Sequence, residues 1–293
     1  MDKDVRLALL GDHEAAKRLT DAGVLVMQGD CLELLKDIPD GSVDMVLCDL
    51  PYGTTYYIEW DRPIPFEPLW AQYLRICKDT TPIVLFGKEP FSSELRLSNR
   101  KMFRYDWVWE KTVFPDFAMA KMRPRAAHEM ISVFYKRQPI YNPQMESGPA
   151  YLRKGGKRTG KQCMRPNSSL EKRADTVNFG TRYPSSIQKF SNGNNKSLHP
   201  TQKPVPLLEY LIRTYTNPGM LVLDNCMGSG STGVACVNTG RNFIGMELDP
   251  GYFEVAKRRI EEAQAQARLA WNTRAPILSE SELKKLRGGG EED

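Results

Sequence analysis

The sequence lacks any long apolar segment of the kind that indicates a membrane protein. None of its stretches approaches the roughly 20 consecutive apolar residues needed to cross a bilayer. The first 23 residues mix both charge signs and contain no small-residue cleavage site, so we do not expect a signal peptide. We therefore expect no membrane partner.

Metal-binding cysteine patterns are also missing. The six cysteines form no CxxC pair and show no zinc-ligand spacing. Dispersed cysteines without a signal peptide are typical of a reducing compartment. We therefore expect a cytoplasmic protein that holds no metal. The sequence also contains no internal repeat.

Acidic residues are scarce in one segment of the chain. Residues 151–203 contain twelve Lys or Arg but only Glu171 and Asp175, a net charge of +10, whereas the whole chain carries +5. A basic segment on an acidic body favours a surface that faces a polyanion. A solvated basic loop is the plain alternative, and this feature alone does not distinguish it from a nucleic-acid-binding surface.

Short apolar runs alternate with helical patterns over most of the 293 residues. Strands are predicted at 24–28, 43–48, 81–87, 104–110, 130–136, 220–224 and 242–248. Helices are predicted at 31–38, 65–78, 205–216, 231–239 and 251–271. This alternation indicates an α/β fold with a mostly parallel sheet and helices on both faces.

The chain divides by composition into five parts. We expect an N-terminal helical extension (1–23), a catalytic half (24–139), an inserted region rich in Gly, Asn, Ser and basic residues (140–198), a cofactor-binding half (199–271) and a tail (272–293). The inserted region shows little hydrophobic periodicity and is predicted to be a separate module or long ordered loops. The tail is expected to be disordered.

The most informative segment is MLVLDNCMGSGSTGVACVNTGRNFIGMELD at 220–249. It reads as strand, glycine turn, helix, strand and acid, and contains GxGxxG at Gly228, Gly230 and Gly233, with Glu247 further on. No Lys follows the glycines, which excludes a P-loop. Asp224 would repel a pyrophosphate, and only about 70 residues follow, too few for a dinucleotide fold. S-adenosylmethionine fits better, because it offers a ribose and an α-amino group but no phosphate.

Three ordered motifs carry a family resemblance. DLPY (49–52) follows a strand, HPTQKP (199–204) leads into a helix, and LDNCMGSGSTGVAC is followed by IGMELD. Together they resemble the DNA amino-methyltransferases, which act on adenine N6 or cytosine N4. The catalytic tetrapeptide precedes the glycine turn, as in the β class of that family. The resemblance covers about residues 24–265 and implies the S-adenosylmethionine-dependent methyltransferase fold, a Rossmann-like sheet, with a target-recognition region at 140–198.

The resemblance also implies a set of site residues. The methyl-acceptor site is expected at Asp49, Leu50, Pro51 and Tyr52. The cofactor residues are expected to be Asp30, Cys31, Thr201, Lys203, Asp224, Gly228, Gly230 and Glu247, with Asp30 on the cofactor adenine and Thr201 and Lys203 near its carboxylate. The DNA-binding residues are expected to be Arg153, Lys154, Lys157, Arg158, Lys161 and Arg182.

Two positions depart from the family pattern. The family usually has proline where this chain has Leu50, and leucine keeps the carbonyl but loosens the turn. It often has Pro-Phe where this chain has Asn225-Cys226, so packing beside the cofactor methionine is expected to differ. Neither change removes a group that the chemistry needs.

The implied chemistry explains why DLPY follows a strand. An exocyclic amine is a poor nucleophile because its lone pair is delocalised into the ring, and two acceptors, the Asp49 carboxylate and the Leu50 carbonyl, can counter this. The base must flip out of the duplex to reach them, and Tyr52 can stack on it. We expect direct in-line attack on the sulfonium methyl, without metal or covalent cysteine.

The initial Asp of DLPY favours adenine N6 over cytosine N4. Two alternative functions stay open: a methyltransferase that acts on a protein glutamine amide, and a nucleic-acid-binding module with a vestigial cofactor site.

Members of this family often form homodimers, and the sequence leaves the oligomeric state open. It does not reveal the DNA recognition sequence, because base readout depends on which side chains reach base edges.

Overall fold

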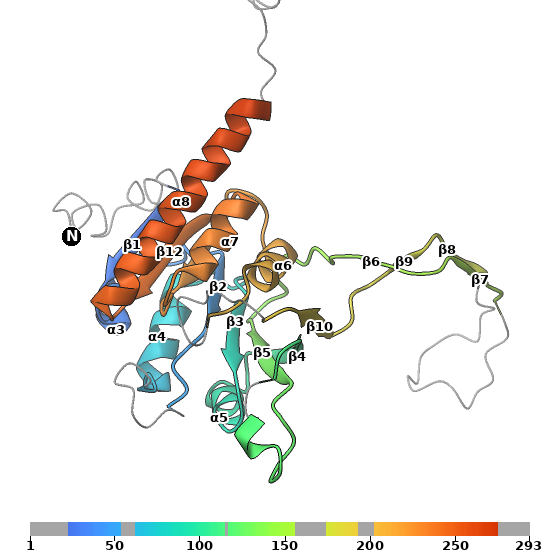
Figure 1. Ribbon diagram of the computed structural model, residues 1–293, viewed down its shortest axis with the longest axis horizontal. Helices are drawn as coiled ribbons and strands as arrows, with labels where there is room; N and C mark the ends of the chain where they lie inside the picture. The colour runs from blue at the N-terminus through green and yellow to red at the C-terminus, as the bar shows by residue number, and fades with distance from the viewer. Residues whose placement is uncertain (1–22, 54–61, 115–116, 156–173, 193–201, 275–293) are drawn as a thin grey trace, which may run out of the picture.

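The core of the protein is an eight-stranded sheet (Figure 1). The computed structural model describes residues 23–53, 62–114, 117–155, 174–192 and 202–274. The strands of this sheet are β1 (Val24–Gln28), β2 (Met45–Cys48), β3 (Ile83–Gly87), β4 (Phe103–Lys111), β5 (His128–Phe134), β10 (Ile187–Phe190), β11 (Leu221–Asp224) and β12 (Asn242–Glu247). Their order is β1-β12-β11-β2-β3-β5-β4-β10.

The sheet is mostly parallel, as the sequence predicts. Strand β5 is antiparallel to both of its neighbours, β3 and β4, and all other pairs are parallel. All seven predicted strands are present, with ends within two residues of the prediction. The α/β fold class is therefore confirmed.

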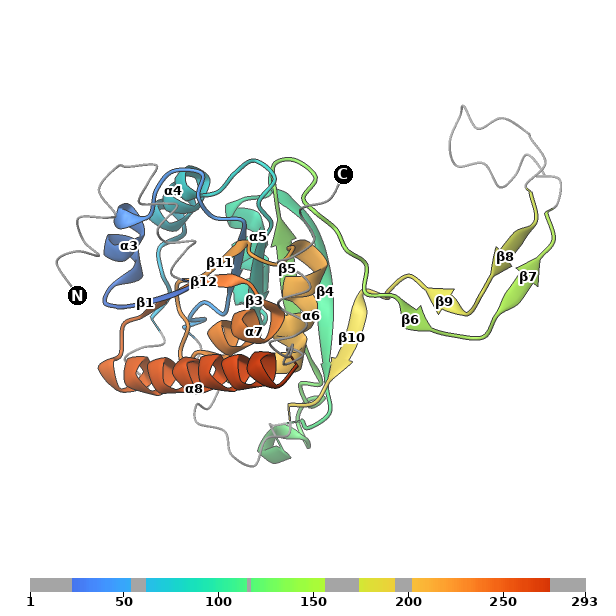
Figure 2. The ribbon, with the colours of Figure 1, turned by 90° about the horizontal axis from the view of Figure 1, so that it is seen from above.

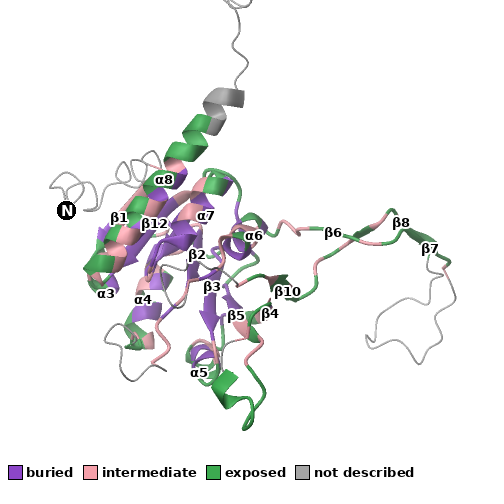
Figure 3. Cartoon of the chain, viewed as in Figure 1, coloured by how far each residue is buried: buried purple, intermediate pink, exposed green. Residues whose placement is uncertain are grey.

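Two sets of helices cover the two faces of the sheet. The first set is α3 (Cys31–Leu34), the 3-10 turn η1 (Leu35–Asp37), α4 (Phe66–Ile76) and α5 (Phe91–Ser98), and it packs against one apolar cluster. The second set is α6 (Val205–Tyr215), α7 (Ser231–Thr239) and α8 (Pro250–Arg274), packed against the other cluster. Neighbouring residues of one strand, such as Val46 and Leu47, enter opposite clusters, because side chains alternate across a sheet. Figure 3 shows the resulting buried strands between exposed helix surfaces.

Two details of the helices differ from the prediction. The helix predicted at 31–38 is α3 followed by η1, and α5 was not predicted. Helix α5 is only eight residues long and is followed by Asn99, so its pattern is too short to stand out by periodicity. A further 3-10 turn, η2 (Phe117–Met119), lies in the connection between β4 and β5.

The N-terminal and C-terminal parts of the chain share this one sheet. Strands β11 and β12 lie between β1 and β2, so they separate two strands that are neighbours in the sequence. Each contact in this part is parallel, and all four strands therefore end at the same edge of the sheet. The two strands of the predicted cofactor-binding half thus lie as an adjacent pair between β1 and β2 of the predicted catalytic half.

The described residues of the region 140–198 form a thin projection and one strand of the main sheet. Two short antiparallel pairs, β6 (Glu146–Ser147) with β9 (Thr181–Arg182) and β7 (Tyr151–Arg153) with β8 (Thr176–Asn178), form a ribbon that extends away from the body (Figure 2). We call residues 146–153 and 176–182 the ribbon. After it, β10 returns to pair with β4 at the edge of the main sheet, so this part of the predicted insertion is built into the core sheet. Residues 1–22 of the predicted N-terminal extension (1–23) and residues 275–293 of the predicted tail (272–293) lie outside the described residues.

Among the residues that the structure describes, no helix combines the length and the apolar character needed to cross a bilayer.

Candidate active site at the carboxyl edge of the sheet

Four acidic residues lie along one edge of the sheet. Asp30 follows β1, Glu247 ends β12, Asp224 ends β11 and Asp49 follows β2. Because these strands are parallel neighbours, their carboxyl ends form a continuous row in the order Asp30, Glu247, Asp224, Asp49. Ligands of open α/β sheets bind at this edge. We call this row and the loops around it the catalytic edge.

Asp224 and Asp49 are electrostatic neighbours although they lie far apart in sequence. Burial raises the pKa of Asp224 to about 6, and hydrogen bonds from Thr232 and from the Cys226 N–H oppose this rise. The charge of Asp49 acts in the same direction as burial. The side chain of Cys48, next to Asp49 in the sequence, also interacts with Asp224. The structure thus brings the DLPY tip and the glycine turn to the same side of the molecule.

The glycine turn has the backbone geometry that close approach of a ligand requires. Gly228 has a φ of +52°, and a Cβ added there would meet no atom within 4 Å, so its outer side is open. Gly230 has a φ of +78°, and its added Cβ would lie 2.9 Å from Cα of Ala256 in α8. Gly230 is therefore needed for packing as well as for its φ, whereas Gly228 leaves backbone exposed to a ligand.

Glu247 is held in place by the turn. Its Oε2 accepts a hydrogen bond from the Gly228 N–H at 2.8 Å, and its Oε1 accepts one from the Asp249 N–H at 2.9 Å. Asp249 caps α8 by accepting from the Tyr252 N–H at 2.8 Å. The Glu247 carboxylate is therefore oriented at the strand end, and lone pairs on both oxygens are left for hydroxyl groups of a ligand.

Helix α8 anchors the turn from behind. The third glycine of the pattern, Gly233, allows close packing, since an added Cβ would lie 2.4 Å from Cδ1 of Ile260. Arg259 donates hydrogen bonds to the carbonyl of Ser229 and to its Oγ, the latter at 2.9 Å. Sequence reasoning missed Arg259, because an arginine on an amphipathic helix carries no signal of a contact 30 residues away.

Asp30 and Cys31 lie at the outer end of the catalytic edge. Asp30 is exposed and caps α3, with Oδ1 accepting from the Leu32 N–H at 2.8 Å. Cys31 is buried, and its hydrogen bond with Cys226 together with burial raises the pKa of its thiol. Cys31 is therefore a neutral, apolar part of the wall near the glycine turn.

The Asn225-Cys226 departure has a structural explanation. Asn225 is buried, and its Oδ1 accepts a hydrogen bond from the Tyr73 hydroxyl of α4 at 2.5 Å. The Cys226 N–H donates to Oδ1 of Asp224 at 3.1 Å. A polar link between α4 and the turn thus takes the place of the apolar pair that the family pattern has here.

The DLPY loop places its acid against the sheet end. The side chain of Leu50 is buried in the core cluster between the sheet and α4, so apolar packing holds the position where the family has proline. The Tyr52 hydroxyl donates a hydrogen bond to Oδ1 of Asp49, and the Tyr52 ring lies 5.0 Å from that of Phe91. The Tyr52 ring is thus part core and part site wall.

Lys203 lies directly on the carboxylate of Asp49. Its Nζ is 2.5 Å from Asp49 Oδ2 and 3.2 Å from Oε2 of Glu129, which also pairs with Lys111 through Oε1. The four side chains form a balanced cluster of two negative and two positive charges. Lys203 is only 7% exposed.

The pKa values of this cluster follow from mutual stabilisation. Burial raises the pKa of the Asp49 carboxyl, and the Lys203 ammonium opposes this rise. Burial acts to lower the pKa of Lys203, but Asp49 and Glu129 raise it above its ordinary value. Although burial acts against it, the pKa of Glu129 is lowered by Lys203 and Lys111. Lys203 is therefore a permanent cation at neutral pH.

Glu129 was missed by sequence reasoning. It stands in phase with Ile131 and Val133 in β5, both of which are buried. An acid in register with buried apolar residues is a signal, because an ionised carboxylate is buried only when it is paired. The available lysines are too far away in sequence to be identified as its partners.

The predicted DNA-binding residues fall into three groups. Arg153, at the outer end of the ribbon, and the adjacent Lys154 are exposed. Arg182 ties the ribbon together, since it donates to the carbonyls of Thr181 at 2.9 Å and Pro149 at 2.5 Å and lies 4.8 Å from the Tyr151 ring. Three predicted DNA contacts, Lys157, Arg158 and Lys161, and the predicted cofactor residue Thr201 lie outside the described residues.

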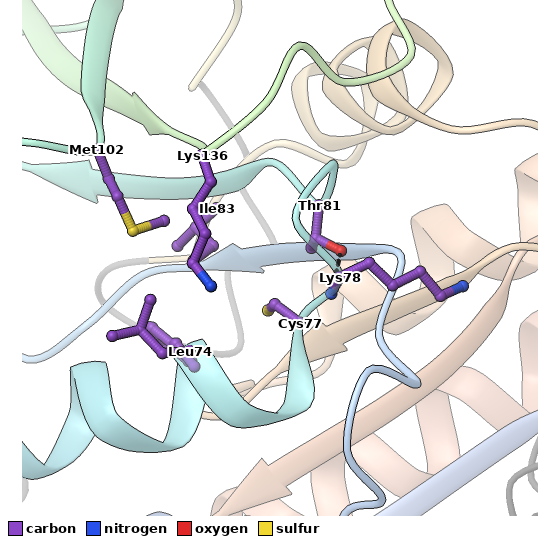
Figure 4. A pocket seen from close by; sticks show the side chains of 8 residues that line it. Leu74, Cys77, Lys78, Thr81, Ile83, Met102 and Lys136 are labelled. Carbon is purple, nitrogen blue, oxygen red and sulfur yellow. Dashed lines mark hydrogen bonds between the residues drawn. The ribbon is translucent and has the colours of Figure 1, made fainter.

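A separate small pocket lies at the opposite end of β3 (Figure 4). Its lining includes Cys77, Lys78 and Thr81, which precede β3, whereas the catalytic edge lies beyond the other ends of the parallel strands. It is therefore not part of the candidate site.

The fold and the site define a DNA-modifying enzyme family. A family model described as DNA methylase, of the N6/N4 methyltransferase type, matches residues 43–258. The chain belongs to this N6/N4 DNA methylase family, and it is a DNA amino-methyltransferase.

Individual relatives agree with this assignment. The chain is 27% identical over 254 residues to the DNA adenine methyltransferase YhdJ of Escherichia coli (strain K12), covering 81% of this chain and 83% of the relative. The structure of the M1.HpyAVI–SAM complex is 25% identical, with a TM-score of 0.54 over 80% of this chain and 99% of that one. The cytosine-N4-specific PvuII DNA methyltransferase is 17% identical and shares the fold, with a TM-score of 0.55 over 84% of this chain and 92% of that one.

Proposed function

We propose that this protein is an S-adenosylmethionine-dependent, site-specific DNA methyltransferase that acts on the exocyclic N6 of adenine. The observation that carries the proposal is the common edge of β2 and β11, where the acid of DLPY adjoins a glycine turn with an open side. Adenine is favoured by the initial Asp49 and by the similarity to YhdJ, described as a DNA adenine methyltransferase.

The residues around the glycine turn suit S-adenosylmethionine. Glu247 is oriented to accept from ribose hydroxyls, Asp224 is a buried acid suited to an α-amino group, and the open side of Gly228 admits a ligand close to the backbone. Asp30 would lie nearest the adenine, at the β1 end of the row. When bound, the cofactor supplies a methyl group activated by a sulfonium. M1.HpyAVI, a structural relative, is described as a complex with SAM.

The acceptor side is assigned to the DLPY loop. The Asp49 carboxylate and the Leu50 carbonyl would accept the two N–H bonds of the target amine, freeing its lone pair for in-line attack. Pro51 stiffens the loop, and Tyr52 would stack on the flipped base, a contact worth roughly 1–3 kcal/mol. That gain offsets part of the cost of unstacking and unpairing the base.

The ribbon is the proposed target-recognition element. Arg153 at its outer end and the adjacent Lys154 are exposed, and Lys157, Arg158 and Lys161 belong to the same basic segment of the sequence. Arg182 adds positive charge while it holds the two ribbon strands together.

We also propose that the enzyme is cytoplasmic, since the described cysteines are free thiols. The proposed assembly is a homodimer.

The deciding experiment is transfer of a tritiated methyl group to duplex DNA, followed by nucleoside analysis. N6-methyladenine is the expected product. N4-methylcytosine as the sole product would assign the enzyme to the alternative specificity of the same family. Label on a protein glutamine, with none on DNA, would refute the proposal.

A further inference from the structure

Lys203 is placed to serve the catalytic acid. Its Nζ lies 2.5 Å from Asp49 Oδ2, and the ring centroids of Phe86 and Tyr52 lie 5.2 Å and 5.8 Å from it. Glu129 holds the same ammonium from β5 at 3.2 Å. Two carboxylates and two aromatic faces thus hold a lysine that sequence reasoning assigned to the cofactor carboxylate.

We propose that Lys203 and Glu129 are positioning residues that fix the orientation and the ionised state of Asp49. This inference rests on the proposed function of Asp49 as acceptor for the target amine. Among the described residues, Tyr52 binds Oδ1 of Asp49 and Lys203 binds Oδ2, so both oxygens of the carboxylate are held in place. The remaining lone pairs of a fixed, charged carboxylate give the amine a defined acceptor.

Glu129 is needed because a lone lysine would not hold this position. A long lysine side chain has many rotamers, and one surface-type contact rarely fixes it. Here the ammonium is bound from two strand ends, β2 and β5, and Lys111 of β4 balances the second carboxylate. Removing the charge of Lys203 or that of Glu129 changes the electrostatic potential at the Asp49 carboxyl group. The two changes have opposite signs.

The expected sign of each change follows from the groups that face Asp49. These are Lys203 before α6, Glu129 on β5 with its partner Lys111 on β4, Tyr52 in its own loop, and Cys48 and Asp224 at the ends of β2 and β11. Loss of the Lys203 cation raises the pKa of Asp49, since an ammonium favours the carboxylate. Loss of the Glu129 charge lowers it, since a second anion disfavours ionisation.

The test compares pH profiles of methyl transfer at saturating S-adenosylmethionine. Lys203→Met should shift the acidic limb of the rate profile to higher pH by about one unit or more, and Glu129→Gln should shift it to lower pH. Lys203→Met should also reduce transfer at neutral pH by about a hundred-fold, while Lys203→Arg restores the position of the limb. Burial raises the pKa of Asp224 to about 6 as the largest cause, and Asp49 contributes least of the groups that shift it, so these variants reach Asp224 only indirectly, through Asp49.

Cofactor affinity separates the two roles of Lys203. The dissociation constant of S-adenosylmethionine, measured by calorimetry, should change less than about three-fold in Lys203→Met. A ten-fold weaker cofactor with an unmoved pH limb would overturn the inference and assign the ammonium to the cofactor. A uniform loss of rate at every pH in both variants would also overturn it.

Two controls keep the test decisive. Lys136→Met removes a lysine whose only described ion pair, with Asp79, is exposed, and it should leave the profile unchanged. If Lys203→Met does not fold, Glu129→Gln alone decides the question, because glutamine keeps the shape and one acceptor of the acid. Inactivity of the unaltered protein on DNA would instead refute the proposed function, so the two failures are distinguishable.

Discussion

The catalytic edge and the ribbon differ in which side chains they expose to solvent: charged side chains are mostly buried at the edge, whereas apolar side chains are exposed in the ribbon. At the catalytic edge most charged groups are buried, with Asp224 at 3% and Lys203 at 7% exposure, and Asp30 at its outer end is the exposed one. In the ribbon apolar side chains are exposed, with Leu152 at 59% and Phe179 at 88%. Figure 3 colours most of the ribbon as exposed. The functional groups of the catalytic edge are therefore already held in place by the fold, whereas the apolar side chains of the ribbon are not covered by any other part of the described chain.

The difference has a physical reason. Transfer chemistry needs groups fixed to a fraction of an ångström, which a packed sheet supplies. A two-stranded ribbon is marginally stable by itself, and it gains stability when its exposed side chains meet a partner. Under the proposed function that partner is DNA, which the basic residues beside the apolar ones suit.

The largest effect is expected from removing the acid at the catalytic edge. Asp49→Ala should lower methyl transfer by roughly a thousand-fold or more, because the amine loses a charged acceptor. Cofactor affinity should stay nearly unchanged, because the glycine turn is left intact. Tritium transfer and calorimetry measure the two quantities. Retained activity would contradict the assigned role of Asp49.

Two glycine substitutions sharpen the description of the edge itself. Gly230→Ala should lower the free energy of unfolding by roughly 2–4 kcal/mol, because it combines a left-handed φ with a contact on Ala256. Gly228→Ala should cost only about 1–2 kcal/mol, since its added Cβ meets no protein atom. Gly228→Ala should nevertheless weaken cofactor binding. Urea titration and calorimetry test this pair, and equal losses of stability would contradict it.

The buried acid at the end of β11 predicts a pH-dependent stability. Folding raises the pKa of Asp224 from 3.8 to about 6, so the native chain holds this proton more tightly than the unfolded chain. The contribution of Asp224 to stability therefore falls as pH rises from 3.8 towards 6 and is constant above that. Asp224→Asn should raise the free energy of unfolding by about 2–3 kcal/mol at pH 7.5.

The same substitution has two further consequences. Its stabilising effect should shrink as the pH falls through the window below 6, as thermal unfolding at several pH values would show. It should also weaken S-adenosylmethionine binding, because the cofactor amino group loses a carboxylate. A pH-independent change in stability would mean that Asp224 is ionised equally in both states.

The smallest effect on the protein itself is expected from the ribbon. The double substitution Arg153→Ala/Lys154→Ala should leave thermal unfolding unchanged, since both side chains are exposed. It should reduce the slope of log affinity for DNA against log salt by about 2, one for each lost phosphate contact. Lys136→Ala is the matched control on the body of the protein. An unchanged slope would exclude these two residues from the DNA interface.

Several features of this protein could be predicted from the sequence alone. All seven predicted strands exist, because each is a short apolar run between turn residues, a pattern read within a few positions. The acids at 30, 49, 224 and 247 are also visible, since each lies at or just after the end of such a run. The order of the DLPY, HPTQKP and glycine-turn motifs was sufficient to indicate the family.

Further features depend on contacts between distant parts of the chain. The Asp49–Lys203 pair joins residues 154 positions apart, and Glu129 joins it only because β5 lies two places from β2 in the sheet. Likewise, strand β10 could not be predicted, because it is only four residues long and lies in a polar region of the sequence. It forms a strand through its hydrogen-bonded pairing with β4. Local periodicity specifies the strands, whereas strand order decides which strand ends meet, and with them which buried charges become partners.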